Sequence, residues 1–178
     1  MKMKKFPLLC AAATVLLGGC STFGFGSSNN DDDNVPTVVK KKADYGQAYK
    51  DYVELGAQYL QMGRYDLAEP KLQRAIEIDS HPPEAWNILA VLYEEKRDIA
   101  SGNQVYQKLI HSHPEYLLGY TNYATFLCKF DRDSEMQALL GQMRGRNAEF
   151  KAAAGIAEGN CMQRRGQSGT AENAYKQA

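Results

Sequence analysis

The sequence repeats itself with a period of about 34 residues. Three copies follow one another without insertion from Tyr49, Pro83 and Leu117, and most of a fourth stands near the end. Small residues favour positions 8, 20 and 27 of each copy, whereas large apolar residues favour positions 4, 7, 11, 17 and 24. Small residues let two helices approach, and large ones fill the space between neighbours. The pattern predicts pairs of helices that stack, because one pair cannot bury its apolar face alone.

The first copy is the most regular. Its large and small positions hold Leu55, Gly56, Tyr59, Gly63, Tyr65, Ala68, Leu72 and Ala75. The second and third copies hold Trp86, Leu89, Ala90, Tyr93, Tyr106, Tyr120, Tyr123, Ala124, Leu127 and Leu140. The fourth holds Gly159, Met162, Gly166, Ala171, Tyr175 and Ala178. The pattern closely resembles the tetratricopeptide repeat. The resemblance implies an all-α, right-handed solenoid of antiparallel helix pairs, with three full repeats and most of a fourth, at about 49–82, 83–116, 117–150 and 152–178.

Four positions of the middle copies depart from the pattern. Arg97 and Asp131 replace the usual glycine at position 15, and Gly102 and Met136 replace alanine at position 20. We therefore expect the second and third repeats to pack less ideally than the first.

Three further features concern the helix ends. Pro70 is compatible with a helix only in its first turn, where the missing N–H is not needed, so we expect it there. Residues 144–150 are expected to loosen the junction between the third and fourth repeats. Ala178 lies inside a predicted helix, whereas solenoids usually finish with a polar capping helix. We therefore expect the chain to be a truncated version of a longer one.

The first residues have the layout of an export signal. A basic segment at 1–5 precedes an apolar stretch at 6–17, and Leu17-Gly18-Gly19 stands directly before Cys20. This ending resembles the lipobox of bacterial lipoproteins, which implies removal of residues 1–19 and acylation of Cys20. Ser21 follows rather than Asp, which resembles lipoproteins sent to the outer membrane. The alternatives are an ordinary secretory signal and a transmembrane helix, for which the stretch is short, since a span needs about 20 residues.

Residues 20–42 are predicted to form a flexible tether that carries the acylated cysteine. Residues 23–30 are polar apart from two aromatic residues, and the charged runs 31–33 (Asp) and 40–42 (Lys) follow. Such a composition cannot bury enough apolar surface to fold, and about 22 residues of it reach roughly 25 Å. Residues 43–178 then form the repeat domain.

Charge gives little support to nucleic-acid binding. The chain has 21 basic and 21 acidic residues, and removal of Lys2, Lys4 and Lys5 with the signal leaves a net charge of about −3. Nucleic-acid binders are usually basic on at least one face.

Two cysteines remain after the signal and the lipidated residue are set aside. Cys128 and Cys161 occupy positions 12 and 10 of the first helices of successive repeats, so the two thiols can come within bridging distance. We expect a disulfide in an oxidising compartment. The alternative is a pair of buried free thiols.

No catalytic or metal-binding pattern stands out in the sequence. His111 and His113 end a predicted helix, but no cluster of Cys, Asp or Glu joins them at ligand spacing. The helix dipole favours histidine near a C-terminal helix end, which accounts for both residues. The alternative is that His111 and His113 serve a metal-dependent hydrolase or an enzyme accessory. We therefore expect a protein that is not an enzyme and that has no cofactor.

Solenoids of this type bind partner segments in a groove lined by the first helix of each repeat, at positions 2, 5, 9, 12 and 13. The residues predicted to line it are Val53, Ala57, Leu60, Asn87, Val91, Glu94, Glu95, Thr121, Thr125 and Lys129. The positions that grip a terminal carboxylate in heat-shock-chaperone binders are uncharged here, which argues against such a clamp; they are Val53, Ala57, Ile88, Leu118 and Asn122. The first repeat instead offers an apolar wall suited to an amphipathic helix or a hydrophobic strand. The alternative is that a neighbouring element shields this wall.

Two segments narrow the resemblance to one family. The segments 122–128 (NYATFLC) and 155–161 (GIAEGNC), together with the lipobox, resemble the PilF/PilW family of type IV pilus biogenesis and stability lipoproteins. The resemblance runs from the lipobox to the last residue, but members of the family generally carry more repeats.

The family resemblance implies a pilotin. Such a lipoprotein stands on the periplasmic face of the outer membrane, binds secretin subunits of the type IV pilus, and helps them reach the membrane and multimerise. Its partners would be the secretin and, through Cys20, membrane lipid, with no nucleic acid and no small-molecule substrate. The alternatives are a lipidated scaffold for outer-membrane protein assembly or cell-wall enzymes, and a non-functional fragment.

Overall fold

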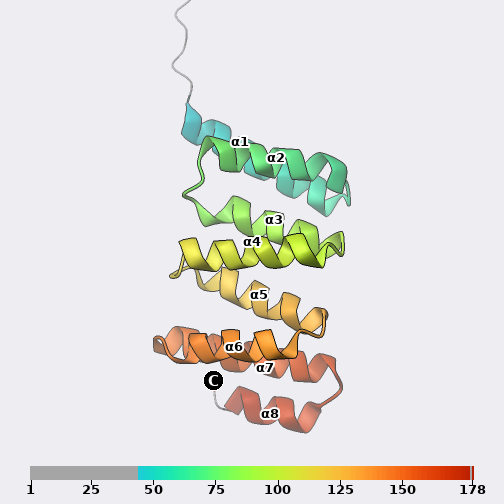
Figure 1. Ribbon diagram of the computed structural model, residues 1–178, viewed down its shortest axis with the longest axis vertical. Helices are drawn as coiled ribbons and strands as arrows, with labels where there is room; N and C mark the ends of the chain where they lie inside the picture. The colour runs from blue at the N-terminus through green and yellow to red at the C-terminus, as the bar shows by residue number, and fades with distance from the viewer. Residues whose placement is uncertain (1–43, 177) are drawn as a thin grey trace, which may run out of the picture. The chain divides into compact units, whose positions relative to one another are not determined.

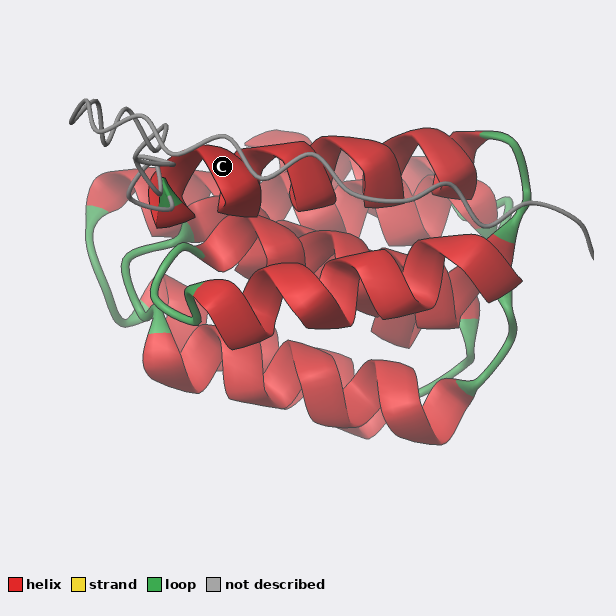
Figure 2. Cartoon of the chain, turned by 90° about the horizontal axis from the view of Figure 1, so that it is seen from above, coloured by secondary structure: helices red, strands yellow, loops and turns green. Residues whose placement is uncertain are grey.

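The computed structural model describes residues 44–176 and 178, and it is α-helical throughout its ordered elements. The helices are α1 (Tyr45–Gln61), α2 (Tyr65–Ile78), α3 (Pro83–Glu95), α4 (Ile99–Ser112), α5 (Leu117–Lys129), α6 (Asp133–Arg144), α7 (Ala148–Arg164) and α8 (Ser168–Lys176). Figure 1 shows them stacked in chain order, with α1 at one end and α8 at the other. In Figure 2, viewed along the stack, their axes run roughly side by side.

Each helix packs on the helices next to it in the chain, and α1, α3, α5 and α7 also contact one another in series. This is the stacking that the repeat predicts, so the all-α tetratricopeptide-type fold is confirmed. Helices α3 and α5 begin at Pro83 and Leu117, the predicted starts of the second and third repeats. Helices α1 and α7 begin earlier than the predicted repeats, because Asp44 and Asn147 cap them through side chains that accept from the backbone of Gln47 and Phe150.

In the turn inside each repeat, the residue at position 15 has the left-handed backbone conformation. Its φ is 69° at Gly63, 57° at Arg97, 55° at Asp131 and 76° at Gly166. After each of these residues, the next backbone N–H closes the preceding helix on a carbonyl five residues back, as from Arg64 to Tyr59 at 2.8 Å. This is the Schellman motif, which glycine adopts without strain. The chain therefore keeps the turn at Arg97 and Asp131, although a side chain in that conformation costs about 1–2 kcal/mol.

The expectation of poorer packing in the middle repeats is wrong. The side chain of Phe126 is completely buried, and a Cβ on Gly102 would come within 2.9 Å of its ring. The absence of a side chain at position 20 of the second repeat therefore makes room for this aromatic ring. Met136, at the same position of the third repeat, is 3% exposed and belongs to the same core.

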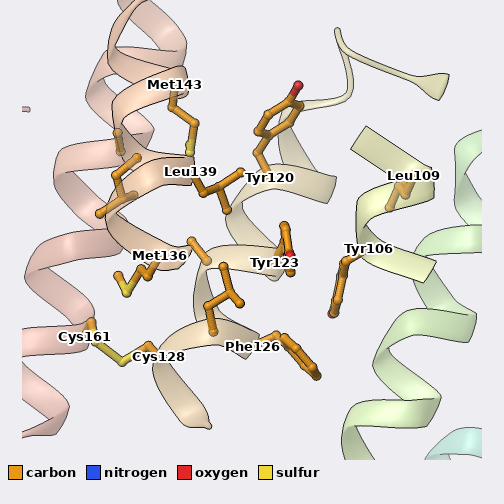
Figure 3. Close-up of a cluster of buried hydrophobic side chains, with 14 of the residues drawn as sticks. Tyr106, Leu109, Tyr120, Tyr123, Phe126, Cys128, Met136, Leu139, Met143 and Cys161 are labelled. Atoms are coloured by element: carbon orange, nitrogen blue, oxygen red, sulfur yellow. A yellow bond between two sulfur atoms is a disulfide. The ribbon is translucent and has the colours of Figure 1, made fainter. Parts of the chain in front are cut away.

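Aromatic side chains fill the largest core cluster (Figure 3). Tyr106 stacks on Tyr123 with ring centroids 5.3 Å apart, and Phe126 packs against Tyr106 at the same separation. On the other side, Tyr120 meets the edge of Phe150 at 5.2 Å. The cluster thus joins α4, α5, α6 and α7 into one core.

The expectation that Pro70 lies in the first turn of a helix is wrong. Pro70 lies beyond the first turn of α2, and the helix continues through it to Ile78. The proline is exposed, and only one intrahelical bond, to the carbonyl of Asp66, is lost at that point.

The junction between the third and fourth repeats is compact rather than loose. The connection between α6 and α7 spans only residues 145–147. Phe150 is 3% exposed, and the Arg146 guanidinium lies over its ring, 4.2 Å from the centroid. Arg146 also donates to the hydroxyl of Tyr120 at 2.9 Å. The cap at Asn147 and these contacts hold the segment that the repeat pattern alone left unassigned.

Candidate partner-binding groove

The helices α1, α3, α5 and α7 form one face of the stack, which we call the A-helix face. The predicted groove residues lie on it. Val53, Ala57 and Leu60 are half-buried on α1, and Val91 is half-buried on α3. Neighbouring helices therefore present a partly exposed apolar strip over the first two repeats.

Polar side chains of α3 and α5 meet across the second and third repeats. Asn122 on α5 donates its amide to the side chain of Asn87 on α3 at 2.9 Å, and Asn87 is 8% exposed. Lys129 on α5 binds Glu94 at 3.0 Å and Glu95 at 3.2 Å on α3. Partial burial opposes the charge on Lys129, but the bonds to the two glutamates outweigh it and raise the pKa of the ammonium group. One lysine therefore offsets one of the two glutamate charges at this end of the A-helix face.

The hydroxyl groups of Thr121 and Thr125 donate within their own helix. The hydroxyl of Thr121 donates to the carbonyl of Leu118, and that of Thr125 to the carbonyl of Thr121, both at 3.0 Å. The third repeat is thus less polar on this face than its sequence indicates.

A hollow of about 480 Å³ opens at the start of α1 and α3. Tyr49, Val53 and Pro82 are its apolar lining, together with the backbone of Gly46. The hydroxyl of Tyr49 donates to the carbonyl of Pro82 at 3.5 Å and accepts from the backbone of Ala85 at 3.3 Å. Burial is the main reason that the pKa of Tyr49 rises to about 12, so its hydroxyl is uncharged at neutral pH.

Two apolar residues of the A-helix face were missing from the predicted groove. Leu118 is 50% exposed and Ile156 is 49% exposed. They stand at positions 2 and 5 of the third and fourth repeats, so the same register that selected Val53 points to both. The groove prediction followed the polar residues of the third repeat and stopped before the fourth.

Cys128 and Cys161 are joined by a disulfide in the structure (Figure 3), with their Cα atoms 5.8 Å apart. Both residues are buried, between α5 and α7. Arg165 reinforces the link: its guanidinium donates to Asp131 at 3.2 Å, to Asp133 at 2.6 Å and to the carbonyl of Cys128 at 3.4 Å. The third and fourth repeats are therefore cross-linked on the side where Cys128 ends helix α5.

The two histidines lie at the C-terminal end of α4. His111 lies in the last turn of α4, and His113 is its C-cap. Among residues 44–176 and 178, no three His, Cys, Asp or Glu side chains gather closely enough to hold an ion.

The predicted lipidation site lies outside the described residues, since Cys20 and the rest of 1–43 fall before them. Of the eight described helices, none combines the length and the apolar character that crossing a membrane requires.

The stack of paired helices, closed by the same turn in each repeat, defines a solenoid of the tetratricopeptide type. No protein-family model matches the chain. The type IV pilus assembly protein PilF of Pseudomonas aeruginosa is 30% identical to it over 119 residues, which are 67% of this chain and 43% of that protein. The chain is a PilF-like tetratricopeptide-repeat protein, as its sequence predicted, and it matches less than half the length of this relative.

A solved structure of Pseudomonas aeruginosa PilF has a similar fold. It superposes with a TM-score of 0.61 over 75% of this chain and 61% of that one, at 22% sequence identity. This likeness supports the helical-repeat architecture.

Proposed function

We propose that this protein is an outer-membrane lipoprotein that acts as a pilotin for the type IV pilus. In this proposal residues 1–19 are removed, acylated Cys20 anchors the chain, and residues 20–42 tether the repeat domain to the periplasmic face. The repeats bind secretin subunits and promote their arrival and multimerisation in the membrane. The match to a type IV pilus assembly protein over 119 residues is the observation that carries the proposal.

The A-helix face is the proposed binding surface. Its apolar strip and the hollow beside Val53 suit a hydrophobic strand or the apolar side of a helix. Anchoring keeps the repeats close to the membrane, which raises the effective concentration of a partner bound there. Binding and location suffice for this role, and no covalent step is required of the protein.

The test is an immunoblot for secretin multimers that resist heat and detergent, in cells with the gene deleted and then restored. We expect deletion to convert multimers to monomers and the intact gene to restore them. Cys20→Ala should fail to restore the multimers because the protein leaves the membrane fraction, and Val53→Glu should fail although the protein stays there. Ile99→Glu, an equally drastic change at an exposed position of α4, is the matched control and should restore them.

Persistence of the multimers after deletion would contradict the pilotin proposal. In that case a lipidated scaffold for other outer-membrane proteins or cell-wall enzymes becomes the better account. Restoration by Val53→Glu would leave the pilotin role intact and move its binding surface elsewhere.

A further inference from the structure

The hollow at the start of α1 and α3 has an acidic rim as well as an apolar lining. Glu54, Asp79 and Glu84 stand around it with a single basic residue, Lys50. Among the described residues, Glu54 accepts from the neutral amide of Gln58, and Asp79 accepts from the backbone N–H of His81 at 3.0 Å. No ion pair involves Glu84 among the residues that the structure describes. The rim therefore carries negative charge that the repeat domain does not neutralise.

The opposite end of the same face differs in this respect. There Lys129 binds both Glu94 and Glu95, so each carboxylate already has a cationic partner within the protein, although one negative charge remains in excess. A charged ligand would have to displace an existing ion pair at that end, whereas at the hollow it would meet an unpaired carboxylate. Electrostatic selection of a partner is thus concentrated at the hollow.

The lining of the hollow is preformed. Tyr49 is 8% exposed, and its two hydrogen bonds to the segment before α3 fix the ring against Pro82 and Ala85. A ligand side chain entering here meets an apolar surface that needs little rearrangement, so most of the burial energy is available for binding.

We infer that the hollow binds a segment in which an apolar side chain stands beside a lysine or arginine. The apolar side chain fills the space over Tyr49 and Val53, and the basic group lies against Glu84 and Glu54. The inference rests on the proposed function only in assigning this segment to the secretin. The chemistry of the ligand follows from the hollow itself.

The probe is a random-peptide phage library selected on the full-length chain in detergent micelles. We expect the enriched peptides to pair a branched apolar residue with Lys or Arg. Fluorescence polarisation of one enriched peptide should then show weaker binding to Glu84→Lys by about fivefold to tenfold at low salt, with a smaller ratio at high salt. The same peptide with its basic residue changed to Glu should regain binding on Glu84→Lys, because both charges are then reversed.

Two variants serve as controls. Glu149→Lys makes the same change at an exposed position of α7, away from the hollow, and should leave the peptide affinity unchanged. Glu84→Gln removes the charge without reversal and should weaken binding by a smaller factor, which covers the case that Glu84→Lys melts the start of α3.

The inference is overturned by any of three outcomes: no enrichment, enriched peptides without a basic residue, or an affinity that Glu84→Gln and Glu84→Lys leave unchanged. The secretin blot is read separately. If the peptides show the expected selectivity but deletion of the gene leaves the secretin multimers intact, the pilotin role is refuted and the inference about the hollow stands. If deletion abolishes the multimers but the peptides show no selectivity, the pilotin role stands and the inference about the hollow is refuted.

Discussion

The first and third repeats follow the same sequence pattern, but they are packed differently. Around the first repeat the buried residues fall into two small clusters, one at each end of α1 and α2. Around the third, one large aromatic cluster, a disulfide and the Arg165 guanidinium join α4 to α7. The large hollow lies at the first repeat. The third and fourth repeats are thus the more extensively cross-linked, whereas the first repeat carries the hollow of the proposed binding surface.

The most severe test of this difference is the replacement of one aromatic side chain by alanine in each region. Phe126→Ala should lower the free energy of unfolding by about 3–5 kcal/mol, since it empties a fully buried site at the centre of the aromatic cluster. Tyr59→Ala should cost only about 1–2 kcal/mol, because Tyr59 is half-buried beside the smaller cluster. Urea unfolding followed by circular dichroism measures both. Equal losses would mean that the two regions are equally well packed.

Removal of the disulfide should have the next largest effect. The replacement of Cys128 and Cys161 by serine frees a loop closed over 33 residues, which should cost about 2–4 kcal/mol. Hydrogen exchange should locate the loss in α5–α8 and leave α1 and α2 unchanged. Uniformly faster exchange over all eight helices would show that the solenoid unfolds as a single unit, and the regional comparison would fail.

The helix pairs and their stacking could be predicted because the 34-residue pattern is local and occurs in four copies. The first residues of α1 and α7 were not predicted because both helices begin before the consensus does. Asp44 and Asn147 are nevertheless recognisable N-capping residues. The packing around Gly102 was misjudged for another reason. Its missing side chain is compensated by Phe126, which lies in the next repeat, and one position of a consensus cannot reveal a partner so distant.

The character of the predicted groove could not be inferred from the sequence. The register selected Val53, Ala57 and Val91, which lie half-buried on α1 and α3, and their role in binding stays a prediction. It could not show that the hydroxyl of Thr125 turns back to its own helix, or that Glu94 is neutralised from the next repeat. Both depend on side-chain geometry rather than on spacing. The acidic hollow likewise depends on Asp79 and Pro82, which lie between helices and outside any groove position.

The left-handed turns allow a comparison of the middle repeats with the outer two. Arg97→Gly should raise the free energy of unfolding by about 0.5–1 kcal/mol, because glycine relieves a positive φ at the cost of some chain entropy. Gly63→Ala should lower it by about 1 kcal/mol, although open space surrounds the position. Gly141→Ala inside α6 is the control and should be stabilising by about 0.5–1 kcal/mol. If Gly63→Ala is also stabilising, the turn is not strained by a side chain and the argument fails.

The smallest expected effect concerns the contact between the first repeat and the second at acid pH. Glu69 on α2 accepts from Lys96 at 2.6 Å and from Tyr93 at 2.8 Å, both at the end of α3. Burial opposes ionisation of this carboxyl, but the bonds from Lys96 and Tyr93 outweigh it and lower its pKa. A carboxyl whose pKa is lowered by folding adds stability above its unfolded pKa of about 4.3, and that stability is lost as pH falls through the folded value.

Glu69→Gln should therefore reduce the free energy of unfolding at pH 7 and have progressively less effect as the pH is lowered below about 4. Urea unfolding across this range, for the wild-type and variant chains, measures the difference. Asp133→Asn is the counterpart in the cross-linked repeats, since Arg165 is the main reason that the pKa of Asp133 is also lowered. In the wild-type chain at acid pH, hydrogen exchange should become faster in α1 and α2 first. These helices lose the Glu69 bonds and have no covalent link to the second repeat, whereas the disulfide still holds α5 to α7 when Asp133 is protonated. Simultaneous loosening at both places would show that the cross-link does not distinguish the two ends of the solenoid.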